Sequence, residues 1–181
     1  VRAGQLPSGT RAFINSVSNQ YPSDQVLTEL EKLYPDTLSR VVLEITEGEE
    51  PDRDLSRTKK ARMRVWGGLL ALDDYGTGYN TEAVLVDITP DIVKVDVSLV
   101  HRIDRDSNRL ALVRNLMAYA KVRGIKVLAE GVETLMEMET LISCGVDYLQ
   151  GYYISRPQLE VPEVSAAVVE DIRLLHERYF A

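Results

Sequence analysis

The sequence predicts an α/β fold, in which strands and helices alternate and the strands form a mostly parallel sheet. The main observation is that short runs rich in apolar and β-branched residues alternate with stretches in which apolar residues recur at helical spacing. A second observation is that no linker, low-complexity run or internal repeat separates these segments. We therefore expect residues 1–181 to form a single domain.

Six strands and five helices are predicted. The strands are residues 11–15, 41–46, 69–73, 92–96, 126–130 and 148–150. The helices are residues 23–33 with Ser23 as the cap, 51–66, a segment from near 107 to at least 120, 134–144 before the glycine at 145, and 162–179.

The sheet is either open or closed into a barrel. The residues that follow the first strand, 15–18, contain no glycine, which argues against the phosphate loop of a dinucleotide-binding sheet. A complete eight-stranded barrel usually needs about 250 residues, so a barrel would require two strands beyond the six. Residues 1–10 leave no room for them.

Composition narrows the possible ligands. The net charge is −7 and the isoelectric point is about 4.9, so the chain has no basic surface for long nucleic acid. A small anionic substrate stays compatible with this charge if metal ions supply local positive charge. The single cysteine, Cys144, cannot form an internal disulfide, and no apolar run is long enough to span a membrane.

Each predicted strand carries a polar side chain near its C-terminal end. Because side chains alternate along a strand, these residues share one face of their strands, and in a barrel they would converge on the mouth where active sites lie. The six residues are Asn15, Glu44, Asp73, Lys94, Glu130 and Gln150.

Several of these residues predict a site for hard divalent cations. Asn15, Glu44, Asp73 and Asp74 offer only oxygen atoms, which favours Mg²⁺ or Mn²⁺ over zinc. The adjacent carboxylates of Asp73 and Asp74 repel each other unless cations lie between them, as in two-metal phosphoryl sites. We expect both histidines, at 101 and 176, to be surface residues, and residues 75–79, with two glycines, to form a mobile loop.

The motifs around these residues resemble the EAL domain family of bacterial cyclic di-GMP phosphodiesterases. The resemblance covers nearly the whole chain. It is carried, in order, by Asn15 within Phe-Ile-Asn-Ser-Val-Ser, 43–47 (Leu-Glu-Ile-Thr-Glu), 72–79 (Leu-Asp-Asp-Tyr-Gly-Thr-Gly-Tyr), 93–96 (Val-Lys-Val-Asp), 128–133 (Leu-Ala-Glu-Gly-Val-Glu), 149–153 (Leu-Gln-Gly-Tyr-Tyr) and the Arg-Pro pair at 156–157.

The resemblance implies a fold, a reaction and a role for each matched residue. The fold is a TIM-like (β/α) barrel, and the reaction is attack of a metal-bound water on one phosphodiester bond of cyclic di-GMP, which gives linear pGpG. The implied metal ligands are Asn15, Glu44, Asp73 and Asp74, for two Mg²⁺ or Mn²⁺ ions. The implied catalytic residues are Glu130, which orients or deprotonates the water, Lys94 and Gln150, and Glu47 is implied to anchor the loop 75–79.

The chain also departs from the family pattern. It contains no Glu-Ala-Leu segment followed by arginine, the strand that gives the family its name and that supplies a metal-binding glutamate and a substrate arginine. The resemblance implies that this strand and the one before it, the first two of the barrel, precede Val1. Tyr75 stands where the family most often has phenylalanine. We therefore expect phosphodiesterase activity of the parent domain, and the sequence leaves open whether this chain alone is active.

Two other functions are compatible with parts of the sequence. A non-catalytic module that binds cyclic di-GMP or a protein partner is disfavoured because the residues at Asp73, Asp74, Lys94 and Glu130 are retained. A Schiff-base aldolase using Lys94 is disfavoured because nearby carboxylates favour the charged form of the lysine. The expected partners are cyclic di-GMP, a second copy in a homodimer, and upstream sensor or cyclase-like domains. The expected location is cytoplasmic, with a membrane tether in the parent protein left open.

Overall fold

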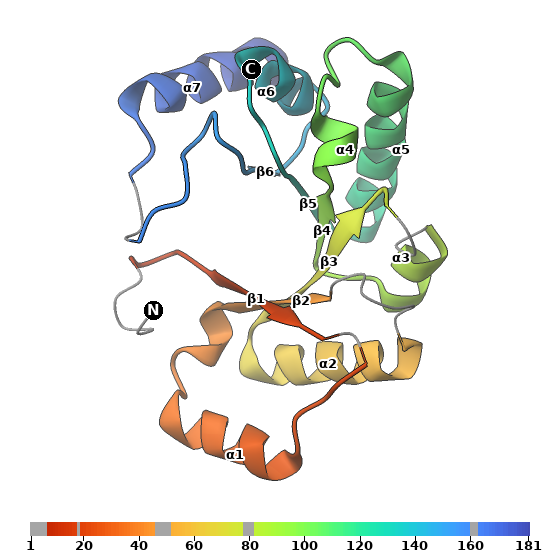
Figure 1. The fold of residues 1–181 in the computed structure, drawn as a ribbon, viewed down its shortest axis with the longest axis vertical. Helices are drawn as coiled ribbons and strands as arrows, with labels where there is room; N and C mark the ends of the chain where they lie inside the picture. The colour runs from red at the N-terminus through yellow and green to blue at the C-terminus, as the bar shows by residue number, and fades with distance from the viewer. Residues whose placement is uncertain (1–6, 18, 46–51, 78–81, 160–162) are drawn as a thin grey trace. The chain divides into compact units, whose positions relative to one another are not determined.

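The computed structural model describes residues 7–17, 19–45, 52–77, 82–159 and 163–181. These residues divide into two compact units. The first holds the described chain up to Asp74 together with residues 82–92, and the second holds residues 75–77 and the chain from Val93 onward. Each unit alternates strands with helices, as predicted from the sequence (Figure 1). No helix in the described ranges is both long enough and apolar enough to cross a bilayer.

The first unit is built from parallel strands connected through helices. Its strands are β1 (Ala12–Ser16), β2 (Val41–Ile45) and β3 (Leu69–Tyr75), and its helices are α1 (Asp24–Leu33), the short 3₁₀ helix η2 (Leu38–Arg40), α2 (Arg53–Trp66) and α3 (Glu82–Ile88). β1 pairs in parallel with β2, and β2 with β3. Parallel pairing brings the C-terminal ends of these strands to one edge of the sheet.

The core of the first unit lies between this sheet and α2. Val42, Ile45, Leu70 and Leu72 of the strands are fully buried, and Met63 of α2 is 1% exposed. Lys59, also on α2 and buried, donates a 2.6 Å hydrogen bond from Nζ to the carbonyl oxygen of the residue at position 17. This bond ties α2 to the segment that follows β1 and so holds the end of the strand that carries Asn15.

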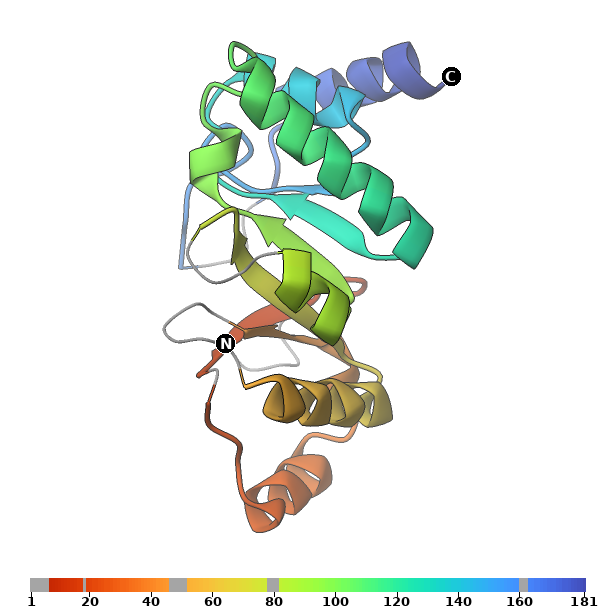
Figure 2. The ribbon, with the colours of Figure 1, turned by 90° about the vertical axis from the view of Figure 1, so that its right-hand side faces the viewer.

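The second unit repeats the strand–helix alternation. Its strands are β4 (Ile92–Val95), β5 (Lys126–Ala129) and β6 (Tyr148–Leu149), and its helices are α4 (Val97–Val100), α5 (Ser107–Arg123), α6 (Leu135–Ser143) and α7 (Ala166–Phe180). β5 and β6 are parallel. Helix α5 packs on β5 and α6 packs on α7, as Figure 2 shows. Val93, Val95, Val127, Met138 and Leu141 form a fully buried core.

The predicted strands are confirmed, and their ends differ by small amounts that have local causes. β4 ends at Val95 because the Asp96 side chain accepts a hydrogen bond from the Ser98 amide and caps α4. Helix α2 starts at Arg53, and α7 starts at Ala166, because Asp52 and Ser165 cap them. The predicted helix start at Pro51 lies outside the described residues, as does the one at Pro162.

Candidate active site

Asn15 and Glu44 lie side by side at the C-terminal ends of neighbouring strands in the first unit. They are register partners across the β1–β2 pair, so their side chains emerge on the same face. Glu44 is 6% exposed, whereas Asn15 is exposed. On the other side of β2, Glu44 is the register partner of Ala71, two residues before Asp73. The parallel register thus places three of the predicted metal ligands on consecutive strands at one edge of this unit.

Asp73 and Asp74 bring two carboxylates together at the end of β3. Consecutive strand residues normally point to opposite faces. Here Asp74 adopts a left-handed backbone conformation with φ of 53°, and carboxylate oxygens of the two residues lie within 4.8 Å of each other. The Asp74 amide also donates a 3.1 Å hydrogen bond to Oδ1 of Asp73. A non-glycine residue held at positive φ carries a conformational cost, a feature that clusters at functional sites.

In the second unit, Lys94 of β4 and Glu130 at the end of β5 form an ion pair. The distance from Lys94 Nζ to Glu130 Oε1 is 2.8 Å, and their side chains are 8% and 19% exposed. The backbone supports this contact, because the Glu130 amide donates a 3.1 Å hydrogen bond to the Val95 carbonyl oxygen. The pair places a cation and a carboxylate, the carboxylate partly open to solvent, at the ends of adjacent strands.

Gln150 continues the polar strand ends of the second unit. Its amide donates to the Ala129 carbonyl oxygen at 2.9 Å, and its own carbonyl accepts from the Val132 amide at 3.0 Å. The next residue, Gly151, approaches this segment so closely that a Cβ atom there would lie 2.2 Å from the backbone N and O of Val132. Only glycine therefore allows the segment after β5 and the segment after β6 to approach this closely.

The donor atoms of the first unit fit a hard divalent cation. The two aspartates of β3, Glu44 and Asn15 provide carboxylate and amide oxygens, the ligands that Mg²⁺, Mn²⁺ and Ca²⁺ prefer. The histidines lie elsewhere in the second unit, as surface residues. Nδ1 of His101 is 3.7 Å from Glu137, and the exposed His176 ring packs against Phe180 with 5.2 Å between ring centroids.

Two predictions about the loop after β3 have different outcomes. The sequence predicts a mobile loop from Tyr75 onward, but Tyr75 is the last residue of β3 and its side chain is buried, at 8% exposed. The remainder of that loop from residue 78 lies outside the described residues, and so does Glu47, its predicted anchor. The role of Glu47 therefore stays a prediction.

One residue of this region was not singled out from the sequence. Glu137, on α6, is 2% exposed and accepts backbone hydrogen bonds from two segments of the second unit. Its signal was present in the sequence, because Thr134 and Glu137 have the spacing of a capping box. That pattern predicts a helix start, and it does not by itself reveal the second segment, around Arg102.

Known proteins similar in sequence to this chain share one domain family. The family model described as "EAL domain" matches residues 1–157. The "Probable cyclic di-GMP phosphodiesterase PdeA" of Escherichia coli is 35% identical over 133 residues, which are 73% of this chain and 18% of that protein. The chain spans less than a third of the length of the curated relatives that it matches.

Solved structures agree with this match. A standalone EAL protein from Vibrio cholerae in a c-di-GMP bound form is 31% identical, with a TM-score of 0.78 over 90% of this chain and 71% of that chain. BlrP1 of Klebsiella pneumoniae in a manganese/cy-diGMP complex is 35% identical, with a TM-score of 0.76 over 86% of this chain and 41% of that chain. These likenesses confirm the predicted fold class, α/β of the TIM-like barrel type.

Proposed function

The chain belongs to the EAL domain family, and from this premise we propose that it is the catalytic part of a metal-dependent phosphodiesterase that hydrolyses cyclic di-GMP to linear pGpG in bacterial second-messenger signalling. The observation that carries the proposal is the ion pair between Lys94 and Glu130, which places a lysine and a partly exposed carboxylate at adjacent strand ends. The oxygen-only ligands at the strand ends of the first unit support the same reaction.

In the proposed reaction, the first unit holds the metal ions. Asn15, Glu44, Asp73 and Asp74 would hold two divalent cations, Mg²⁺ or Mn²⁺. When bound, the ions lower the pKa of a coordinated water and neutralise the non-bridging phosphate oxygens. Burial of Glu44 and Asp73 favours this role, because buried carboxylates coordinate metals or pair with cations.

The second unit supplies the groups that handle the proton and the developing charge. Glu130 orients the attacking water and accepts its proton. Lys94, held against Glu130, stabilises negative charge as the phosphodiester bond is cleaved. Gln150 contributes hydrogen bonds at the same strand ends, and no covalent enzyme intermediate is required.

Further features of the full protein are part of this proposal. Residues 1–181 belong to one domain, Glu47 anchors the loop 75–79, and the protein acts as a homodimer. Sensor or cyclase-like domains upstream regulate it, and it works in the cytoplasm. The retained polar strand ends support an enzyme over a non-catalytic binding module, because a module that only binds the ligand does not need the Lys94–Glu130 pair.

The test is turnover with defined metals. The full protein to which this chain belongs is incubated with cyclic di-GMP and Mn²⁺ or Mg²⁺, and the products are separated by chromatography. The proposal expects pGpG that appears with metal and disappears when a chelator is added. Binding of cyclic di-GMP without any product would overturn it in favour of the binding module.

A further inference from the structure

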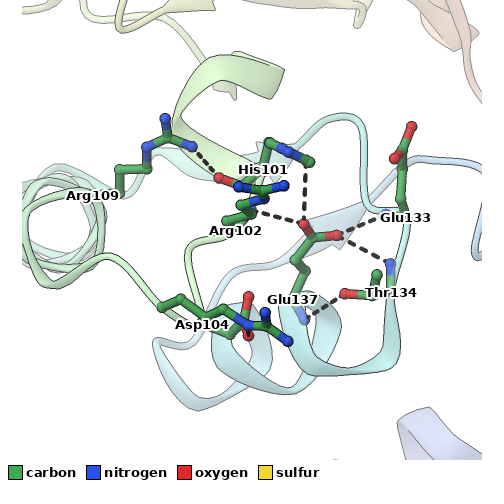
Figure 3. Close-up of polar contacts among 8 residues, drawn as sticks. His101, Arg102, Asp104, Arg109, Glu133, Thr134 and Glu137 are labelled. Carbon is green, nitrogen blue, oxygen red and sulfur yellow. Dashed lines mark hydrogen bonds and ion pairs between the residues drawn. The ribbon is translucent and has the colours of Figure 1, made fainter.

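Glu137 is a buried carboxylate of the second unit that joins two separate segments of the chain. It is 2% exposed and lies in the first turn of α6. Its Oε1 accepts a 2.8 Å hydrogen bond from the Arg102 amide, while its Oε2 accepts from the amides of Glu133 and Thr134, both at 3.0 Å (Figure 3). One side chain therefore accepts hydrogen bonds from three backbone N–H groups. Removing the carboxylate would leave these groups without their acceptor, which costs free energy of folding.

The first of these segments is the turn that follows α4. Arg102 lies there in a left-handed conformation with φ of 58°, a conformation that costs a non-glycine residue energy. Its amide points to Glu137, and the carbonyl oxygen of His101, one residue earlier, accepts from the Arg109 guanidinium on α5. Because α4 follows β4 directly, this turn is a fixed point one short helix after the strand that carries Lys94.

The second segment is the connection from β5 to α6, which begins with Glu130. Its start is held by the hydrogen bond from the Glu130 amide to the Val95 carbonyl oxygen. Its middle is held at Val132, whose amide donates to Gln150 and whose carbonyl accepts from Tyr153. Its end is held by Glu137, through the amides of Glu133 and Thr134.

We propose that Glu137 is a positioning residue for Glu130, an inference that rests on the proposed function and deepens it. By fixing both the turn after α4 and the end of the 130–134 segment, the Glu137 carboxylate keeps the Glu130 side chain against Lys94, at the observed 2.8 Å. Loss of the carboxylate frees the end of the segment and leaves the amides of Arg102, Glu133 and Thr134 without their acceptor. The Glu130 carboxylate then samples orientations away from the lysine.

A simpler role for Glu137 is that it only stabilises the start of α6. It forms a capping box with Thr134, whose Oγ1 accepts from the Glu137 amide at 3.2 Å. Thr134→Ala removes that half of the box and leaves the three hydrogen bonds to the carboxylate in place. Thr134→Ala is therefore a matched control, because it weakens the same helix start without releasing the 130–134 segment.

The first readout is amide hydrogen exchange of the folded protein, and it does not require catalysis. In Glu137→Ala, exchange should be about 10-fold to 100-fold faster at Arg102, Glu133 and Thr134, and the increase should extend to Val132 and Glu130. In Thr134→Ala, faster exchange should stay at the start of α6. If Glu130 and Val132 keep the wild-type exchange rate in Glu137→Ala, the positioning role is wrong.

A conservative variant provides the rescue. In Glu137→Gln the amide oxygen can still accept from Glu133 and Thr134, whereas the amide nitrogen cannot accept from Arg102. Slow exchange should therefore return at Glu133 and Thr134 and not at Arg102. Faster exchange at Glu133 and Thr134, equal to that of the alanine variant, would contradict the assignment of the carboxylate contacts.

The second readout is steady-state kinetics with cyclic di-GMP and Mn²⁺. Glu137→Ala should lower kcat about 10-fold to 100-fold with little change in KM, because the substrate still binds while the water-activating group is displaced. Thr134→Ala should keep the wild-type kcat, and Glu137→Gln should restore most of it. A wild-type kcat in Glu137→Ala would overturn the proposal. If no variant and no wild-type protein turns over, the proposed function fails, and the exchange data still decide the positioning role.

Discussion

The ammonium nitrogen of Lys94 lies 2.8 Å from a carboxylate oxygen of Glu130, which joins the ends of β4 and β5 inside the second unit. Neither residue is near the other in sequence, and both side chains are mostly shielded from water. A charge-assisted contact of this kind fixes the direction of the carboxylate. In the proposed reaction that direction determines which water Glu130 can deprotonate.

The first prediction concerns Glu130. Glu130→Gln keeps the shape of the side chain but removes its ability to accept a proton, so kcat should fall about 100-fold to 10,000-fold. Binding of cyclic di-GMP, measured by calorimetry, should stay near the wild-type value. The matched control is Glu139→Gln on α6, whose carboxylate accepts from Arg178 and Tyr179 and should not affect kcat. A wild-type kcat in Glu130→Gln would show that Glu130 does not activate the water.

The second prediction concerns metal binding by Asp73. Asp73→Asn removes a charged ligand, and Mn²⁺ affinity measured by calorimetry in the absence of substrate should fall more than about 10-fold. Asp91→Asn is the control within the same unit. The Asp91 carboxylate accepts a 2.8 Å hydrogen bond from the Leu70 amide at the start of β3, so its loss should lower stability and leave Mn²⁺ affinity unchanged. Equal losses of affinity in the two variants would argue against a direct role for Asp73.

The third prediction concerns the close approach at Gly151. A Cβ atom in Gly151→Ala would lie 2.2 Å from backbone atoms of Val132, so the segments after β5 and β6 must separate. The free energy of unfolding in urea should fall by more than about 2 kcal/mol. Gly124→Ala is the control, because Gly124 has φ of 68° but nothing within 4 Å of a Cβ, which leaves only a backbone cost of about 1–2 kcal/mol. A larger loss for Gly124→Ala would contradict this packing.

The fourth prediction concerns the acid stability contributed by Glu137. Burial alone would raise the pKa of Glu137, but the hydrogen bonds from Arg102, Glu133 and Thr134 outweigh burial and lower it. Its stabilisation is therefore complete above the unfolded pKa of about 4.3 and is lost as pH falls through the lower folded value. The difference in unfolding free energy between the wild type and Glu137→Gln should shrink across this acid range.

The imidazole of His101 also lies near this carboxylate, with Nδ1 3.7 Å from it. The same pair of proteins is therefore compared again in a His101→Gln background, which removes the imidazole. The shrinking difference should persist there. A difference that grows as pH falls below about 4 would contradict the lowered pKa of Glu137.

The sequence predicted the order of the strands and most helices, because apolar periodicity and caps such as Ser23 and Thr134 act locally. It did not predict α3 or α4. Both are short, and α4 begins at Val97, directly after its cap Asp96, which the alternating pattern assigned to the preceding strand. A capping aspartate and a strand-end aspartate have the same appearance in a sequence, and only the hydrogen bond to the Ser98 amide distinguishes them.

For the candidate site, strand alternation and parallel register account for the positions of Asn15 and Glu44. They do not account for Asp74. Regular alternation would point its side chain away from Asp73, whereas Asp74 has a positive φ and its carboxylate lies near that of Asp73. Alternation predicts carboxylates near Lys94, but it does not predict that Glu130 is the one that pairs with it at 2.8 Å, because that contact depends on how β4 and β5 pack. Glu137 was missed because its second partner, Arg102, is distant in sequence.

The most direct test of the central claim is hydrolysis in isotopically labelled water. The full protein to which this chain belongs is incubated with cyclic di-GMP and Mn²⁺ in water enriched in the heavy oxygen isotope, and the product is analysed by mass spectrometry. Attack by water predicts pGpG with one heavy oxygen on its terminal phosphate. Unlabelled product, or intact cyclic di-GMP bound to a folded, metal-loaded protein, would contradict the account.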